Sequence, residues 1–367
     1  IANAVTRTTS AFFEPAMDYV VCKAPRWDLE KFPGVEAQIG TEMKSVGEVM
    51  GIGRSFGEAL QKALRMLDIG VSGLDPGAFE FDDLRRELRE PTPRRIFAVA
   101  QAFEKGMDID EVFELTRIDR FFLAEIKALV SIGKRLSLAG AKGLCAEPLA
   151  AAKREGYSDA RIGELTGVDP ERVRSARLKN GIRPRLAQID TLAAEYPAET
   201  NYLYFTHHAL QSDLRPSKKK KVLVLGSGCY RIGSSVEFDW CSVACARSAR
   251  ELGFETLMLN CNPETVSTDY DLCDRLVFDE ITLETVLELV DQEKPLGVIL
   301  SMGGQTPNNL ALQLHRAGVR VLGTHPDAID CAENRGRFSA LLDKIGIEQP
   351  RWSVAGALED LDAAVES

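Results

Sequence analysis

The feature that most constrains this chain is a change of pattern after residue 216. A basic run at 217–221 is followed by short apolar segments that alternate with stretches of helical periodicity. We expect strands at 222–225, 255–260, 275–278, 297–301 and 319–322, with helices at about 238–253, 282–293 and 308–317. Buried strands that alternate with helices of this length are typical of right-handed βαβ units. Residues 217–334 therefore predict an α/β domain built on a parallel sheet.

The residues before this point follow a different pattern. Residues 74–216 keep the apolar spacing of helices, with no convincing strand, and predict an all-helical domain. Residues 1–73 hold few elements and are interpreted as the C-terminal part of a larger domain. Residues 335–367 open a further helical segment without a stop signal. The expected fold class is α/β plus all-α, and we interpret the chain as an interior piece of a longer protein.

Composition narrows the classes of function. The chain has 45 basic and 55 acidic residues, and its net charge of −10 disfavours broad binding to nucleic acid or to a membrane surface. No run reaches the roughly 18 apolar residues of a membrane span, and no signal peptide is recognisable. The eight cysteines form no C-x-x-C pair and the four histidines show no zinc spacing. We therefore expect reduced thiols, a cytosol-like compartment and no metal site.

A glycine-rich loop follows the first expected strand of the α/β domain. Gly226 and Gly228 suit a dinucleotide-binding fingerprint, but four residues, not two, separate them from Gly233. The second strand ends in Asn260, where a ribose-binding acid would be expected. The pattern favours a simple strand-to-helix turn, and leaves a nicotinamide-dependent oxidoreductase as an alternative.

Two polar loops follow other strands of the predicted sheet. Residues 262–271 come after the second strand, and residues 303–307 come after the fourth. Because the carboxyl ends of parallel strands share one edge, both loops are expected there, where ligands of open α/β sheets bind. A ligand crevice and a hydrogen-bonded surface loop are both compatible with this pattern.

The helical region contains a candidate DNA-binding motif. Residues 158–182 suggest a helix, a turn with Gly167 and a second helix that begins at Pro170. Residues 151–186 hold nine basic and five acidic side chains. A helix-turn-helix regulator is one interpretation, and a helical hairpin with a solvated basic face is the other. His207 and His208 have no nucleophile or carboxylate in a recognisable register, so no catalytic arrangement is identified.

Several longer segments resemble one family. Residues 13–27 (FEPAMDYVVCKAPRW) and 43–54 (MKSVGEVMGIGR) are similar to the end of the first ATP-grasp unit of carbamoyl phosphate synthetase large chains. Residues 116–123 (TRIDRFFL) resemble that family's helical oligomerisation domain. Three further segments resemble the opening of its second half: 226–241 (GSGCYRIGSSVEFDWC), 260–271 (NCNPETVSTDYD) and 303–307 (GGQTP).

The resemblance implies a function for each region. Residues 1–73 would end the carboxyphosphate ATP-grasp domain, 74–216 would form the oligomerisation domain, 217–334 a Rossmann-like pre-ATP-grasp domain, and 335–367 the start of the second ATP-grasp domain. The implied activity is an ATP-dependent carbon–nitrogen ligase that makes carbamoyl phosphate from bicarbonate, ammonia and two ATP, with Mg²⁺ or Mn²⁺. No catalytic residue, ATP or metal is expected within this piece, which should be inactive alone.

The resemblance also implies partners and a role for six residues. The partners would be a glutaminase subunit or fused glutaminase domain and further copies bound through the helical domain, in the cytoplasm or an organelle. A tunnel that shelters unstable carbamate would be lined by Met43, Glu48, Arg231, Ser235, Glu237 and Glu264. The family often has glycine at the position of Ser235, whose side chain could narrow the passage. The alternative is a buried ion pair of Arg231 with Glu237 or Glu264.

Overall fold

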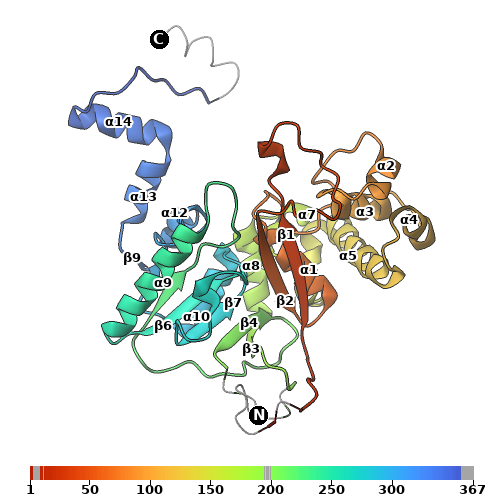
Figure 1. Ribbon diagram of the computed structural model, residues 1–367, viewed down its shortest axis with the longest axis horizontal. Coiled ribbons are helices and arrows are strands. Elements are labelled where there is room, and N and C mark those ends of the chain that lie inside the picture. The colour runs from red at the N-terminus through yellow and green to blue at the C-terminus, as the bar shows by residue number, and fades with distance from the viewer. Residues whose placement is uncertain (3–8, 11, 194, 196–197, 199, 357–367) are drawn as a thin grey trace.

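The computed structural model describes residues 1–2, 9–10, 12–193, 195, 198 and 200–356. Figure 1 shows a central strand hairpin, a cluster of helices on one side of it and a sheet with helices on the other. We name these the hairpin unit (residues 20–67), the helical unit (84–179) and the sheet unit (185–333). The predicted combination of α/β and helical parts is confirmed.

The sheet unit contains seven strands in the order β3-β4-β7-β6-β5-β8-β9. Their bounds are β3 Arg185–Gln188, β4 Tyr202–Thr206, β5 Lys221–Leu225, β6 Glu255–Asn260, β7 Arg275–Phe278, β8 Val298–Ile299 and β9 Val321–Leu322. The pair β3 and β4 is antiparallel, and the other pairs are parallel. The sheet is therefore mainly parallel, as the alternation of strands and helices predicts.

Helices connect these strands and cover both faces of the sheet. Their bounds are α9 Val236–Glu251, η3 Val266–Thr268, α10 Leu283–Glu293, α11 Gln305–Asn308, α12 Ala311–Arg316 and α13 Pro326–Glu333. Leu223 and Leu225 face a core with side chains of α10 and α12, whereas Val224 faces Ala246 of α9. Because successive strand side chains point to opposite faces, both faces of β5 are apolar and buried.

Two strands interrupt the region that was predicted to be helical throughout. The strands β3 and β4 lie between residues 185 and 206, and Leu203 of β4 pairs with Val277 of β7 in parallel. The expectation of no strand in residues 74–216 was therefore wrong. Tyr202, Tyr204 and Phe205 have high β-propensity, but a five-residue run is too short to show a clear period.

The helical unit is built around its longest helix. Its elements are α2 Leu84–Arg89, α3 Arg95–Glu104, α4 Ile109–Thr116, α5 Arg120–Ala139, η2 Gly140–Leu144, α6 Ala146–Arg154, α7 Asp159–Thr166 and α8 Pro170–Lys179. Leu123, Ile126, Leu129 and Leu136 of α5 are buried at helical spacing and pack in one core with the neighbouring helices. Ser158 is the N-cap of α7, because its side chain accepts a hydrogen bond from Arg161 N.

The hairpin unit joins the other two units. Strands β1 (Val20–Arg26) and β2 (Gly47–Gly53) pair antiparallel, η1 (Leu29–Lys31) lies between them, and α1 (Phe56–Met66) packs on them. Val49 belongs to the core of the helical unit, whereas Ile52 packs with Tyr204 in the α9-side core of the sheet unit. The hairpin thus supplies side chains to both neighbouring cores.

The last described elements extend away from the body in Figure 1. Helix α14 (Arg335–Ile345) follows α13 and has no buried residue among those described. The expected terminal helix at residues 358–367 lies outside the described residues. Among the described helices, none combines the length and the apolar character that crossing a bilayer requires.

Candidate functional site at the junction of the units

The glycine-rich loop after β5 is filled by a side chain of the protein itself. Asn260, at the end of β6, is fully buried, and its Oδ1 accepts hydrogen bonds from Gly228 N (3.0 Å) and Cys261 N (2.9 Å). Its Nδ2 donates to Ser267 Oγ at 2.8 Å. A Cβ built on Gly226 would lie 2.5 Å from Asn260 Cγ. Asn260 therefore occupies the space that a phosphate would need, and the oxidoreductase alternative is disfavoured.

The polar groups of the loop at residues 262–271 also form hydrogen bonds within the protein. Val266 N donates to Asp239 Oδ2 of α9 at 2.8 Å, and Thr265 Oγ1 donates to the carbonyl oxygen of Asn262 at 2.8 Å. Burial raises the pKa of Asp239, while the hydrogen bonds from the loop oppose that shift. A Cβ on Gly303 would overlap the carbonyl oxygen of Gly226, so the loops after β8 and β5 are in direct contact. Of the two predicted readings, the structure favours hydrogen-bonded loops over a crevice between them.

The hairpin unit docks on these same loops. Met50 N of β2 donates to the carbonyl oxygen of Cys261 at 3.1 Å, and a Cβ on Gly47 would overlap the carbonyl oxygen of Tyr230. Asp28 Oδ2 accepts from Ile232 N at 2.9 Å. Burial alone would raise the pKa of Asp28, but the Ile232 hydrogen bond and the neighbouring Arg26 lower it. Backbone contacts and the buried, ionised carboxylate of Asp28 therefore form part of this junction.

Three of the predicted tunnel residues are acidic groups at this junction. Glu48 Oε1 lies 2.7 Å from Lys23 Nζ. The charges of Glu237 and Glu264 act on Tyr230, whose pKa is raised first by burial and then by these carboxylates and Asp239. The hydrogen bond that Lys23 donates to Glu48 raises the pKa of Lys23, to which the charge of Glu264 also contributes. The structure thus brings Glu48, Glu237 and Glu264 around Tyr230 and Lys23.

The other three predicted residues have different surroundings. Met43 is 90% exposed. Arg231 forms its ion pair with Asp68, which follows α1, instead of the expected Glu237 or Glu264. Ser235 precedes α9, and its hydroxyl lies 3.5 Å from Glu237 Oε2. The alternative ion pair within the sheet unit was therefore wrong, because the partner of Arg231 comes from the hairpin side of the junction.

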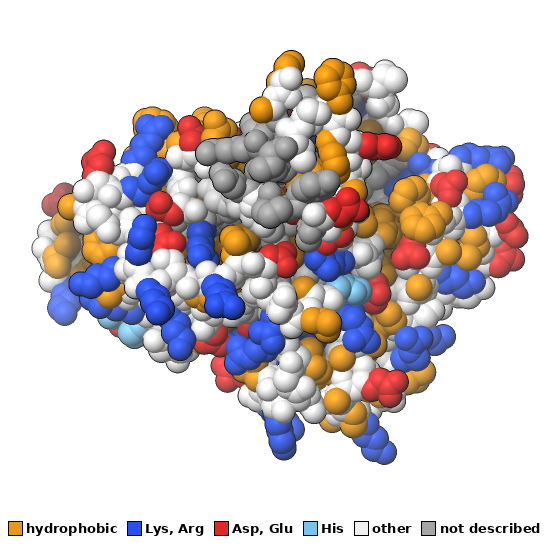
Figure 2. All heavy atoms as spheres, turned by 90° about the horizontal axis from the view of Figure 1, so that it is seen from below, with side chains coloured by type: hydrophobic (Ala, Val, Ile, Leu, Met, Phe, Trp, Pro, Cys, Tyr) orange, Lys and Arg blue, Asp and Glu red, His pale blue; other side chains and the backbone are white. Residues whose placement is uncertain are grey.

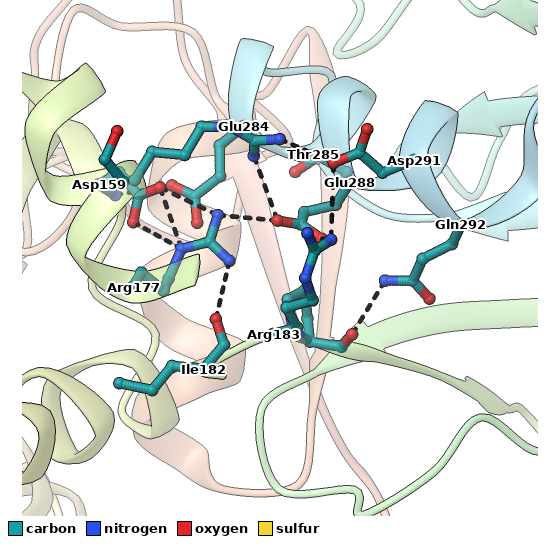
Figure 3. A network of polar contacts seen from close by, with 12 residues as sticks. Asp159, Arg177, Ile182, Arg183, Glu284, Thr285, Glu288, Asp291 and Gln292 are labelled. Atoms are coloured by element: carbon teal, nitrogen blue, oxygen red, sulfur yellow. Dashed lines mark hydrogen bonds and ion pairs between the residues drawn. The ribbon is translucent and has the colours of Figure 1, made fainter. Parts of the chain in front are cut away.

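A buried network of charges fastens the helical unit to the sheet unit (Figure 3). Arg177 of α8 contacts Asp159 of α7 (Nη2–Oδ2 3.1 Å) and Glu288 of α10 (Nη2–Oε1 2.9 Å). Lys153 of α6 contacts Asp159 and Glu284, at 3.1 Å and 2.5 Å. Burial would raise the pKa of Glu284, but Lys153 and Arg177 lower it to about 2. Glu284 is thus held ionised between the two units.

This network accounts for the basic residues of the predicted helix-turn-helix. Arg174 and Arg183 also contact Glu288, and Arg161 contacts Asp75. Five of the nine cations therefore face acidic groups of the protein, which disfavours the DNA-binding interpretation. Arg154, Arg172 and Lys179 are exposed. Figure 2 shows, for the face it presents, Lys and Arg side chains dispersed among acidic and apolar ones.

A second group of buried charges surrounds a small cavity between α1 and the sheet. Lys62 contacts Asp279 at 2.8 Å, and Arg65 contacts Glu280 at 2.6 Å. His207 also lines the cavity, and burial, followed by the charge of Lys153, lowers its pKa well below the usual range. The cavity holds about 40 Å³, far below the roughly 300 Å³ of a small-molecule site.

Two family models and several relatives connect this chain to one family. Residues 48–181 match the family model of the carbamoyl-phosphate synthetase large chain, oligomerisation domain, and residues 218–331 match that of the carbamoyl phosphate synthase preATP-grasp domain. The multifunctional protein pyrABCN of Emericella nidulans is 50% identical over 98% of this chain. The mitochondrial ammonia carbamoyl-phosphate synthase of Rattus norvegicus is 47% identical over 98%. The chain belongs to the carbamoyl phosphate synthetase large-chain family.

The synthetase relatives are much longer than this chain. It spans 16% of pyrABCN, 24% of the rat synthase and 30% of the mitochondrial arginine-specific large chain of Schizosaccharomyces pombe, to which it is 50% identical. The match to the oligomerisation model begins at Glu48, so it includes β2 from its second residue onward and all of α1. This agrees with the packing of Val49 of β2 and Leu60 of α1 in the core of the helical unit. The domain bounds at residues 73, 216 and 334 stay a prediction.

Proposed function

We propose that this chain connects the two synthetic halves of a carbamoyl phosphate synthetase large chain and forms part of the route between them. The whole enzyme would make carbamoyl phosphate from bicarbonate, ammonia and two ATP. Residues 1–73 would end the carboxyphosphate ATP-grasp domain, 74–216 would form the oligomerisation domain, 217–334 the pre-ATP-grasp domain, and 335–367 would begin the second ATP-grasp domain. The chain alone would have no turnover.

One observation carries this proposal. The hairpin unit and the helical unit are both fastened to the same sheet unit, through the Met50–Cys261 and Asp28–Ile232 hydrogen bonds and the Arg177–Glu288 ion pair. A connector between two catalytic halves needs a fixed geometry of this kind, since a transferred intermediate must leave one site and reach the next. Surface contacts between independently moving domains are usually less buried.

The described residues do not fit the ATP and Mg²⁺ or Mn²⁺ that the family implies. The glycine-rich loop is filled by Asn260, and the cavity among the buried charges is too small for a nucleotide. A larger hollow of about 510 Å³ beside α9 is lined by apolar side chains such as Leu252 and Phe254, which offer nothing to a phosphate. We therefore assign no step of phosphate transfer to these residues.

The acidic groups of the junction would lie along a passage that the rest of the large chain would cover, since Glu237 and Glu264 are exposed in this chain. Carbamate is hydrolytically unstable, so exclusion of bulk water would protect it in transit. Glu48, Glu237 and Glu264, with Arg231, Ser235 and Met43, would line this passage. Carboxylates repel an anion, and this lining therefore favours carbamic acid, the protonated form, as the travelling species. Ammonia would come from a glutaminase subunit or fused glutaminase domain, and copies would assemble through the helical unit in the cytoplasm or an organelle.

Replacement of Ser235 by Trp in the full-length enzyme tests the passage. Ser235 lies beside Glu237 at the start of α9, so a large side chain should obstruct the route without touching either nucleotide site. We expect bicarbonate-dependent ATP hydrolysis to persist while the rate of carbamoyl phosphate formation falls by about tenfold or more. A tenfold loss of rate corresponds to an increase of about 1.4 kcal/mol in the activation free energy.

Ser175→Trp is the matched control. Ser175 is exposed on α8, and its hydroxyl donates to Glu171 O within its own helix. This variant should retain both activities. Equal loss of ATP hydrolysis and product in Ser235→Trp would contradict a role in transfer.

A further inference from the structure

Two histidines and one aspartate meet on the surface of the sheet unit. His315 lies in the last turn of α12, His325 is the N-cap of α13, and Asp327 is in the first turn of α13. One potential ligand atom from each residue lies within 4.8 Å of the other two. All three residues are exposed. The sequence showed no zinc spacing because the residues come from two helices whose adjacent ends are joined through β9.

The helices that carry these residues are fixed in the core of the sheet unit. Leu314, next to His315, and Ile329, one turn after His325, are both buried in the same apolar cluster. The imidazole rings of His315 and His325 meet edge to face with centroids 5.2 Å apart. The backbone therefore holds the two rings together, and only side-chain rotation is needed to aim them at a common point.

The distances suit a transition-metal ion. His325 Nδ1 lies 3.5 Å from Asp327 Oδ2. Two ligands of a tetrahedral Zn²⁺ ion, each at roughly 2.0 to 2.2 Å from the metal, are about 3.3 to 3.5 Å apart. His325 Nδ1 accepts only a long hydrogen bond of 3.3 Å from Asp327 N, which a metal would replace.

We propose that His315, His325 and Asp327 form a surface site for Zn²⁺ or a similar divalent transition metal. Two imidazoles and one carboxylate are a ligand set that zinc prefers, whereas Mg²⁺ and Ca²⁺ prefer oxygen ligands. Three protein ligands leave one position for water. Bound metal would fasten α12 to α13 and so fix the point where the chain leaves the sheet unit for α14. The site is independent of the proposed transfer route.

Protection of histidines from diethyl pyrocarbonate tests this site in the full chain. The chain has four histidines, so each modified peptide can be followed by mass spectrometry. We expect one equivalent of Zn²⁺ to slow modification of His315 and His325 by about tenfold, since metal ligation occupies the reactive lone pairs, and to leave His208 unchanged. Mg²⁺ should protect none of them.

Substitutions separate this site from the cysteines, because thiols are also possible ligands for added zinc. His315→Gln and Asp327→Asn should each weaken the Zn²⁺ protection of His325 by about tenfold or more, since even changes outside the ligand set cause losses of that size. His208→Gln is the matched control and should leave protection intact. Unchanged modification rates with Zn²⁺, or full protection of His325 in His315→Gln, would overturn the proposal.

Discussion

Arg177 of α8 and Glu288 of α10 form an ion pair, with 2.9 Å between Nη2 and Oε1, in which the side chains are 0% and 1% exposed. The pair joins the helical unit to the sheet unit. Replacement of both partners of a buried ion pair by well-packed apolar side chains often changes stability little. Removal of one partner is costly, because it leaves the other charge buried without a partner. Each partner of the pair therefore depends on the other when the two units dock.

Removal of the cation should be strongly destabilising. We expect Arg177→Met to lower the free energy of unfolding by about 3 kcal/mol, because Asp159 and Glu288 lose their shared buried partner. Urea denaturation measures this loss. Arg120→Met is the control, since Arg120 and Asp110 form an exposed pair that should be worth about 1 kcal/mol or less. An equal effect of the two substitutions would contradict the structural role of Arg177.

The lowered pKa of Glu284 predicts a pH dependence of stability. Its value of about 2 in the folded chain lies below the 4.5 of a free glutamate, so the ionised form stabilises the fold above pH 4.5. This contribution is lost as the pH falls from about 4.5 towards 2, and amounts to about 3 kcal/mol at most.

Urea unfolding of wild type and Glu284→Gln at several pH values measures this contribution. The difference in unfolding free energy should be largest near neutral pH and shrink below about pH 4.5. Glu147→Gln, an exposed change on α6, should give a small and constant difference. A constant gap for Glu284→Gln as well would contradict the prediction.

Asn260 should be essential to the loops at the sheet edge. Asn260→Ala leaves Gly228 N and Cys261 N without their acceptor, and each buried unsatisfied group costs about 1 to 3 kcal/mol. Denaturation should show a loss of at least about 2 kcal/mol. Asn180→Ala is the control, because Asn180 is exposed at the end of α8, and its loss should stay below about 1 kcal/mol. Equal losses would mean that Asn260 is not the support of these loops.

Asp28 should protect the junction from local opening. In Asp28→Ala, Ile232 N loses its acceptor and Arg26 loses its partner. Hydrogen exchange of the Ile232 amide should accelerate by about tenfold, which corresponds to about 1.4 kcal/mol of local stability. Asp82→Ala, an exposed change before α2, should leave the rate unchanged. An unchanged rate in Asp28→Ala would show that the hairpin stays docked without this carboxylate.

The regular parts of the fold were predictable from local pattern. The strands β6 and β7 have the predicted bounds, and β5 starts one residue earlier than expected. The strands β8 and β9 have only two residues each, and the rest of each expected run continues as a loop. β4 was missed because its pairing with β7 depends on residues about 70 positions away, which no local period encodes, and β3 pairs with β4 alone.

The polar contacts were much less predictable than the strands. Arg177 and Glu288 are more than 100 positions apart, and Asp68 and Arg231 more than 160, so no spacing rule connects them. The resemblance indicated the region of the junction, yet it did not predict Asp68 as the partner of Arg231. Such pairs depend on which faces of the units meet, and this is decided by the packed cores.

The position of Ile52 in the core on the α9 side of the sheet has a practical consequence. A polypeptide that begins at residue 217 would lack both the hairpin and β4, and would leave Val224 and Met258 partly uncovered. Such a truncation should expose an apolar surface and self-associate. Preparations of the sheet unit should therefore retain residues 20–67 along with β3 and β4.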